Sequence, residues 1–129
     1  MTDVSTTVGR VVDSYFAVWN ETDANQRRAA IEAALVPEAS YLDPTLAAQG
    51  HAELDAMVAR VQHRFPGHRF RLTGAVDHHH DRLRWSWDLV GPDGGPPVVS
   101  GVDFAVLAPD GRLREVTGFF ESTRDGAAP

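Results

Sequence analysis

The first half of the chain places apolar residues at steps of three and four, which is the spacing of amphipathic helices. In the first such stretch the apolar positions are Val4, Val8, Val11, Val12, Tyr15, Phe16 and Trp19. Asn20-Glu21-Thr22 interrupts this pattern, so the first helix is expected to end there. Asp23 then has the position of an N-cap with Gln26 as its reciprocal capping partner, and Pro37 is expected to end the second helix.

Residues 40–42 (Ser-Tyr-Leu) are expected to form a short strand, and residues 44–50 a loop. A third helix is expected to begin near Gly50 or His51 and to end at the breaker pair Pro66-Gly67. It carries a single apolar stripe made of Leu54, Met57, Val58, Val61 and Phe65.

The second half alternates polar and apolar residues, which is typical of strands with one buried face. Strands are expected at residues 69–72, 84–89, 98–107 and 113–121. Gly- and Pro-rich residues 91–97 form a hairpin loop, Pro109-Asp110-Gly111 a tight turn, and residues 122–129 a disordered tail. Three helices followed by a meandering antiparallel sheet is an α+β layout, and the helices can bury their stripes only against one face of a curved sheet.

Length and composition limit the possible functions. A chain of 129 residues and 14.1 kDa is a single domain, 1–129, with room for one small pocket. The net charge of -6 argues against nucleic-acid and anionic-membrane partners, which require basic patches. Cysteine is absent and Met1 to Ser5 do not resemble a secretory signal, so a cytoplasmic location is expected.

Two carboxylates, Asp43 and Asp103, lie in stretches whose pattern otherwise predicts a half-buried strand. In the strand at residues 98–107, alternation places Asp103 on one face with Gly101 and Ala105, whose small size leaves space beside it. The alternative is an Asp103 satisfied by a neighbouring backbone group or by Arg84 or Arg114. A cavity-lining acid should have a raised pKa, whereas a salt-bridged acid should have a depressed one.

Asp43 follows the short strand and shares one strand face with Tyr41. An Asp before Pro often caps its own turn, and that is the alternative to a role in a cavity. If Asp43 and Asp103 face one cavity, they can act as an acid and a base at neutral pH.

The chain resembles the nuclear transport factor 2-like superfamily over residues 4–121, and within it the SnoaL-like polyketide cyclases and ketosteroid isomerases. The resemblance rests on residues 39–44 (Ala-Ser-Tyr-Leu-Asp-Pro), on residues 49–54 (Gln-Gly-His-Ala-Glu-Leu), and on the stretch from Val102-Asp103 to Leu113. It implies a cone-shaped sheet. The order and spacing of these three runs together are more specific for the family than any single run is.

The resemblance also implies roles for individual residues. Asp43-Pro44 matches the general base of the isomerases, while Asp103 and Tyr15 match the protonated Asp and the Tyr of their oxyanion hole. Trp19, one helical turn later, could take the place of Tyr15. The epoxide-hydrolase branch uses a late-strand Asp where this chain has Gly118, so that chemistry is not expected.

The sequence predicts an apolar pocket where the apolar stripes of the helices face the apolar side of the strands. Its expected wall is Trp19, Tyr41, Met57, Val61, Phe65, Trp85, Trp87 and Phe119. Trp85 and Trp87 share a face with Leu89, which is either the cavity wall or the outer face of the sheet. His78 and His80 could share a strand face and bind a metal, but a third ligand is missing at a suitable spacing, so we expect a solvated strand end and no metal site.

Two functions remain open at this point. The first is an isomerase or cyclase that needs no cofactor and acts on a small apolar molecule. The second is a non-catalytic ligand-binding or dimeric assembly domain. Val102, Phe104 and Val106 lie opposite Asp103 on their strand, so a homodimer through that face is expected in either case.

Overall fold

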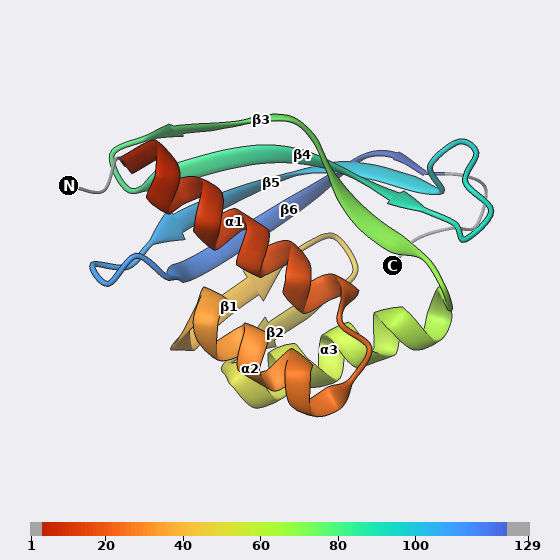
Figure 1. The fold of residues 1–129 in the computed structure, drawn as a ribbon, viewed down its shortest axis with the longest axis horizontal. Helices are drawn as coiled ribbons and strands as arrows, with labels where there is room; N and C mark the ends of the chain where they lie inside the picture. Colours follow the sequence, from red (N-terminus) through yellow and green to blue (C-terminus); the bar gives the residue numbers. More distant parts are fainter. Residues whose placement is uncertain (1–3, 124–129) are drawn as a thin grey trace.

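The computed structural model describes residues 4–123 and consists of three helices on one side of a six-stranded sheet (Figure 1). The helices are α1 (Val4–Asn20), α2 (Ala24–Ala34) and α3 (His51–Arg64). The strands are β1 (Leu35–Leu42), β2 (Ala47–Gln49), β3 (Arg69–His79), β4 (Arg82–Val90), β5 (Val99–Leu107) and β6 (Leu113–Thr123). The expected α+β class, with a curved sheet against helices from the first half of the chain, is confirmed.

The strands lie in the order β2-β1-β6-β5-β4-β3. Neighbouring strands are antiparallel except β1 and β6, which run parallel and make the sheet mixed, so the expectation of an antiparallel sheet is wrong at this one pair. The sheet curves without closing, and α1 lies along its concave face, while α2 and α3 pack below it beside β1 and β2 (Figure 1). The β3–β4 register shifts between Thr73 and Asp77 around Gly74, which has a φ of 75°, and such a bulge bends a strand.

The core fills the space between the helices and the concave face. Its largest fully buried side chains include Trp85, Ile31, Leu35, Met57, Leu89 and Leu113. Burial alternates along β5, with Val99, Gly101, Asp103 and Ala105 inward, so the predicted face of Asp103 is confirmed. Trp85 and Trp87 also point inward from β4, which resolves their two alternatives in favour of the inner face.

Several local expectations are wrong. Asp23 caps α2 as expected by accepting from the Gln26 backbone N–H at 2.9 Å, but its own N–H donates to the Glu21 carboxylate at 3.1 Å instead of to the Gln26 side chain. The second helix ends at Ala34 rather than at Pro37, which lies inside β1. The loop expected at 44–50 contains β2.

The end of the chain also differs from the expectation. Ser122 and Thr123, expected in the tail, belong to β6, and the rest of the expected tail lies outside the described residues. Within residues 4–123, no helix is both long enough and apolar enough to cross a membrane.

Candidate active site

A small cavity lies between α1 and the concave face of the sheet, and both acids reach it. It is lined by Tyr15, Phe16, Trp19, Tyr41, Asp43, Phe70, Trp87 and Asp103. The enclosed part measures about 20 Å³, room for a single water-sized group. The two carboxylates that the sequence singled out therefore share one cavity, and within residues 4–123 no Lys, Arg or His lines it.

Asp103 extends from β5 into this cavity and is 5% exposed. Trp87 Nε1 donates to its Oδ1 at 3.1 Å. Burial raises the pKa of Asp103 from its ordinary 3.8 to about 7, the indole of Trp87 lowers it, the charge of Asp43 raises it, and the indole of Trp85 lowers it. Arg84 is paired with Asp77 at 2.7 Å and Arg114 is exposed, so the salt-bridged alternative for Asp103 is wrong.

Asp43 both caps its turn and lines the cavity. Its Oδ1 caps the turn after β1 by accepting from the backbone N–H groups of Thr45 at 2.9 Å and Leu46 at 2.8 Å. Its Oδ2 accepts from the Tyr41 hydroxyl at 2.7 Å and leaves a further lone pair on that oxygen. The turn therefore fixes the carboxylate at the cavity wall with Oδ2 as its less occupied oxygen.

Tyr15 brings an uncommitted hydroxyl into the cavity from α1. It is 3% exposed, and its Oη makes no hydrogen bond within the described part of the chain. Burial raises its pKa well above 10, the charge of Asp103 adds to the rise, and the nearby Trp19 indole lowers it. The pKa of Tyr41 is raised in the same way, first by burial and then by Tyr15, so both phenols remain protonated donors at neutral pH.

Gly118 allows the two acids to approach each other. β6 lies between β5 and β1, and Gly118 pairs directly with Asp103. A Cβ atom there would lie 2.8 Å from Asp103 Oδ1 and 3.4 Å from both Asp43 Cβ and Tyr41 Oη. The missing side chain is therefore the space across which Asp103 faces Tyr41 and Asp43.

The structure brings together six of the residues proposed from the sequence: Tyr15, Trp19, Tyr41, Asp43, Trp87 and Asp103. Two aromatic wall residues were missed. The inward direction of Phe70 could have been predicted from the alternation of Arg69-Phe70-Arg71. Its ring centroid lies 5.1 Å from that of Trp19 and 5.4 Å from that of Trp87. Phe16 follows Tyr15 on the same helical stripe and could have been found there.

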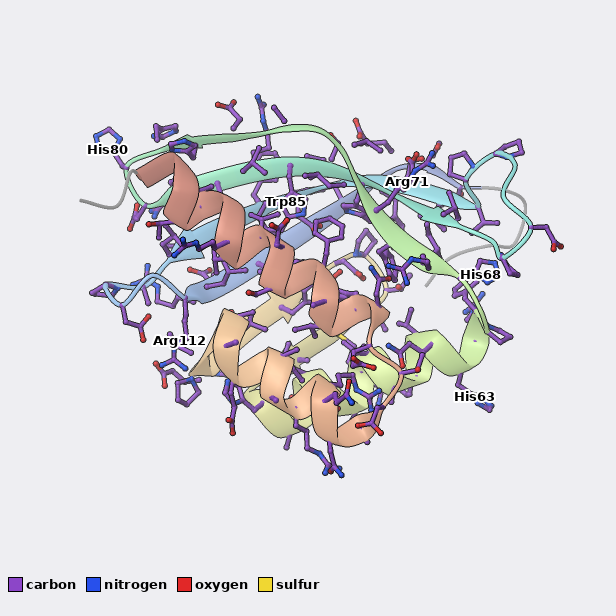
Figure 2. All side chains as sticks on the ribbon, in the orientation of Figure 1. His63, His68, Arg71, His80, Trp85 and Arg112 are labelled. Carbon is purple, nitrogen blue, oxygen red and sulfur yellow. The ribbon has the colours of Figure 1, made fainter. Side chains whose placement is uncertain are left out.

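The remaining proposed wall residues lie elsewhere. Met57 and Val61 are buried in the core between α3 and the rest of the molecule, and Trp85 is buried behind the wall, with its ring 5.4 Å from that of Tyr15. Phe65 lines a separate hollow on the other side of Trp19. Figure 2 shows Trp85 between α1 and the sheet.

The expected place of Phe119 on the cavity wall is wrong. Because Gly118 pairs with Asp103 on the inner face, its neighbour Phe119 must point outward, where it is 52% exposed. It packs there against Phe104, with ring centroids 5.9 Å apart.

The histidines are scattered rather than clustered. His80 lies at the opposite end of the molecule from His63 and His68 (Figure 2). The rings of His79 and His80 contact each other at the exposed end of β3. No three His, Cys, Asp or Glu side chains in this range gather as metal ligands would.

Comparison with known proteins identifies the family. The SnoaL-like domain model matches residues 12–116, so the chain belongs to the SnoaL-like family, with the nuclear transport factor 2-like fold. It is 35% identical to a proposed isomerase of that family from Agrobacterium tumefaciens, with a TM-score of 0.85 over 91% of this chain and 99% of that one. No functionally curated protein matches the sequence significantly.

More distant structures share the fold alone. A proposed SnoaL-like polyketide cyclase from Jannaschia sp. CCS1 is 21% identical, with a TM-score of 0.68 over 94% of this chain and 92% of that one. A de novo designed protein with a curved β-sheet reaches the same TM-score at 10% identity, over 94% of this chain and 88% of that one. Function must therefore be argued from the side chains of the cavity.

Proposed function

We propose that this protein is a cofactor-independent isomerase or cyclase that transfers a proton on a small, apolar, enolisable carbonyl compound. The observation that carries the proposal is Asp103, a buried carboxyl group with a pKa of about 7 that shares a cavity with a second carboxylate. Two carboxyl groups whose environments separate their roles are a common way to provide an acid and a base at neutral pH.

In this mechanism Asp43 is the base. Its Oδ2 removes the proton from the carbon next to the carbonyl group, because Oδ1 is occupied by the turn. The electrons of the C–H bond form the enolate, and the carbonyl oxygen takes up the negative charge. Protonated Asp43 then returns the proton to another carbon. In a cyclase the enolate carbon instead attacks a second carbonyl carbon of the same molecule, the π electrons of that C=O bond move to its oxygen, and protonated Asp43 gives its proton to that oxygen.

Tyr15 and neutral Asp103 are the donors to the enolate oxygen. Both are buried, and a donor fixed in a dry site stabilises developing charge far better than water does. The Tyr15 hydroxyl has no other hydrogen-bond partner in residues 4–123, so it requires no rearrangement before it donates.

The cavity wall indicates an uncharged substrate. Six aromatic residues and two acids line it without a cation, so a carboxylate or phosphate near the reacting carbon would be repelled and left unpaired. The enclosed space holds one carbonyl-sized group, and the rest of the molecule must lie against Phe16 and Phe70, which are only partly buried.

Deuterium exchange into uncharged enolisable ketones tests the proposal, with cyclohexanone and 2-tetralone as probes and the anionic 4-oxocyclohexanecarboxylate as the comparison. Wild-type protein is expected to accelerate exchange of the neutral ketones. Asp43→Asn should reduce this by about 100-fold or more, because an amide cannot accept the proton. Asp103→Leu should rank second, and Asp103→Asn, which keeps an N–H donor, should be mildest.

The competing function is a non-catalytic binding or assembly domain. The observation in its favour is that Asp43 already has a complete structural role as the cap of its turn. Equal exchange in wild type and Asp43→Asn, with both proteins folded and binding the ketone, would remove Asp43 as the base. It would also favour this second function.

A further inference from the structure

β4 presents two indoles to Asp103 from the neighbouring strand. Trp85 is the direct cross-strand partner of Asp103, and Trp87 pairs with Gly101, two residues earlier on the same inner face. The two tryptophans are 1% and 5% exposed, respectively. Their N–H groups are the only kind of polar atom that an indole offers, and they can donate but never accept.

Trp87 makes the first of these contacts through a close fit to β5. Its Nε1 donates to Asp103 Oδ1 at 3.1 Å. A Cβ atom at Gly101 would lie 2.7 Å from Trp87 Cε2 and 2.6 Å from the Phe119 carbonyl oxygen, so glycine lets the indole lie against the strand. Because Oδ1 must be the acceptor, the proton of the neutral acid is carried by Oδ2.

The N–H group of Trp85 has no acceptor within residues 4–123. Its Nε1 is buried without a hydrogen-bond partner within residues 4–123, although the indole is near enough to Asp103 to lower the pKa of that group. Tyr15 Oη is the other buried side-chain polar atom of this range that lacks a partner, and its ring lies 5.4 Å from that of Trp85. A buried donor without an acceptor is costly and calls for a functional explanation.

We propose that Trp85 and Trp87 form an indole clamp that positions Asp103: Trp87 holds Oδ1 in both protonation states, and Trp85 donates to the carboxylate once the proton has left. Both tryptophans are positioning residues, since they act through Asp103. The inference rests on the proposed function in so far as the clamp orients the acid that donates to the enolate oxygen and sets how readily it ionises.

The other groups that face Asp103 make no hydrogen bond to it within residues 4–123. Tyr41 of β1 donates its hydroxyl proton to Asp43, the Tyr15 hydroxyl of α1 has no partner, and the charge of Asp43 opposes ionisation of Asp103. Gly118 of β6 contributes no side chain. The two indoles are thus the groups on β4 that favour the carboxylate form.

The clamp is tested by titrating the Asp103 side-chain carboxyl carbon by NMR in the absence of any substrate. Trp87→Phe should raise the titration midpoint by about one to two pH units, because a hydrogen bond to the charged form is lost. Trp85→Phe should shift it in the same direction by less. Phe104→Leu is the control, since Phe104 follows Asp103 on β5 but lies on the outer face, where it is 43% exposed, and its midpoint should equal that of the wild type.

A second measurement on the unmodified protein covers the case in which a variant fails to fold. The Trp85 Nε1–H proton signal should move downfield with the same midpoint as the Asp103 carboxyl, while the Trp19 signal should not. A Trp85 signal that stays fixed through the Asp103 titration, or a Trp85→Phe midpoint equal to the wild type, would overturn the clamp. Because no substrate is present, this result is independent of whether ketone exchange is catalysed.

Discussion

At the scale of single residues, Asp103 makes the stability of the protein depend on pH. In the unfolded chain its carboxyl ionises near 3.8, whereas in the folded protein burial holds its pKa at about 7. The unfolded state therefore binds fewer protons between these values, and stability falls as pH rises from about 4 to about 7. The protein keeps all of this stability below about pH 4, and ionisation of Asp103 at high pH lowers the free energy of unfolding by about 4 kcal/mol.

Asp103→Asn should remove this dependence. Urea unfolding at pH 4.5 and pH 8 is expected to show similar free energies for wild type and variant at the lower pH, and a more stable variant at the higher pH. Parallel pH profiles for the two proteins would mean that Asp103 ionises normally in the folded state, and the acid-donor role would be lost with it.

The face of Asp103 could be predicted from the sequence, because strand alternation with Gly101 and Ala105 has a period of two that a single strand displays by itself. Its hydrogen bond to Trp87 could not, since that contact depends on the register between β4 and β5. Phe119 illustrates the same limit. Its direction depends on which residue of β6 pairs with Asp103, and pairing between strands is not visible in either strand alone.

At the scale of elements, the candidate site depends on β6 as a spacer between the two strands that carry acids. Asp103 on β5 and Asp43 after β1 are separated by β6, and only Gly118 on its inner face leaves their side chains a common space. Gly118 does not have a positive φ, so its backbone would accept alanine. The glycine is therefore explained by the space that it leaves and not by its conformation.

Gly118→Ala should displace the Asp103 carboxyl, because the new Cβ would lie 2.8 Å from Oδ1. We expect the rate of ketone exchange to fall by about tenfold to a hundredfold, because displacing a reacting group by about 1 Å has an effect of that size. The fold should be retained. Gly9→Ala in α1 is the control, since a Cβ there meets no atom within 4 Å. Wild-type exchange in Gly118→Ala would contradict the role of this space.

The elements that the sequence predicted least well are those formed by pairing rather than by local pattern. β1 begins at Leu35, five residues before the expected strand, and includes Pro37, which cannot donate a ladder hydrogen bond. The β1–β6 register shifts between Leu35 and Ser40, which accommodates the proline. β2 has three residues and exists by pairing with β1, so no local periodicity could reveal it.

At the scale of the whole molecule, the fold alone does not define what the protein does. The designed protein with a curved sheet shares this architecture at 10% identity. The function is therefore argued from a cavity in which two acids and two buried phenols meet an aromatic wall. The helices cover only the concave side of the sheet, so no helix of residues 4–123 lies on the opposite face of the central strands (Figure 1).

That uncovered face has a composition suited to a second copy of the chain. The registers align one row across five strands, made of Leu42, Thr117, Phe104, Arg84 and Asp77. Phe104 and Phe119 are 43% and 52% exposed and pack on each other. The charges of the row are already paired, with Arg84 2.7 Å from Asp77, so covering the face would leave no isolated charge.

We therefore expect a homodimer through the outer sheet face. Sedimentation at micromolar concentration should give twice the monomer mass, and Phe104→Glu should give a monomer, because it would bury two like charges near the symmetry axis of a self-complementary interface. Ala56→Glu adds the same charge on the exposed side of α3 and should remain dimeric. A wild-type monomer, or equal dissociation by Phe104→Glu and Ala56→Glu, would show that the exposed phenylalanines serve another purpose.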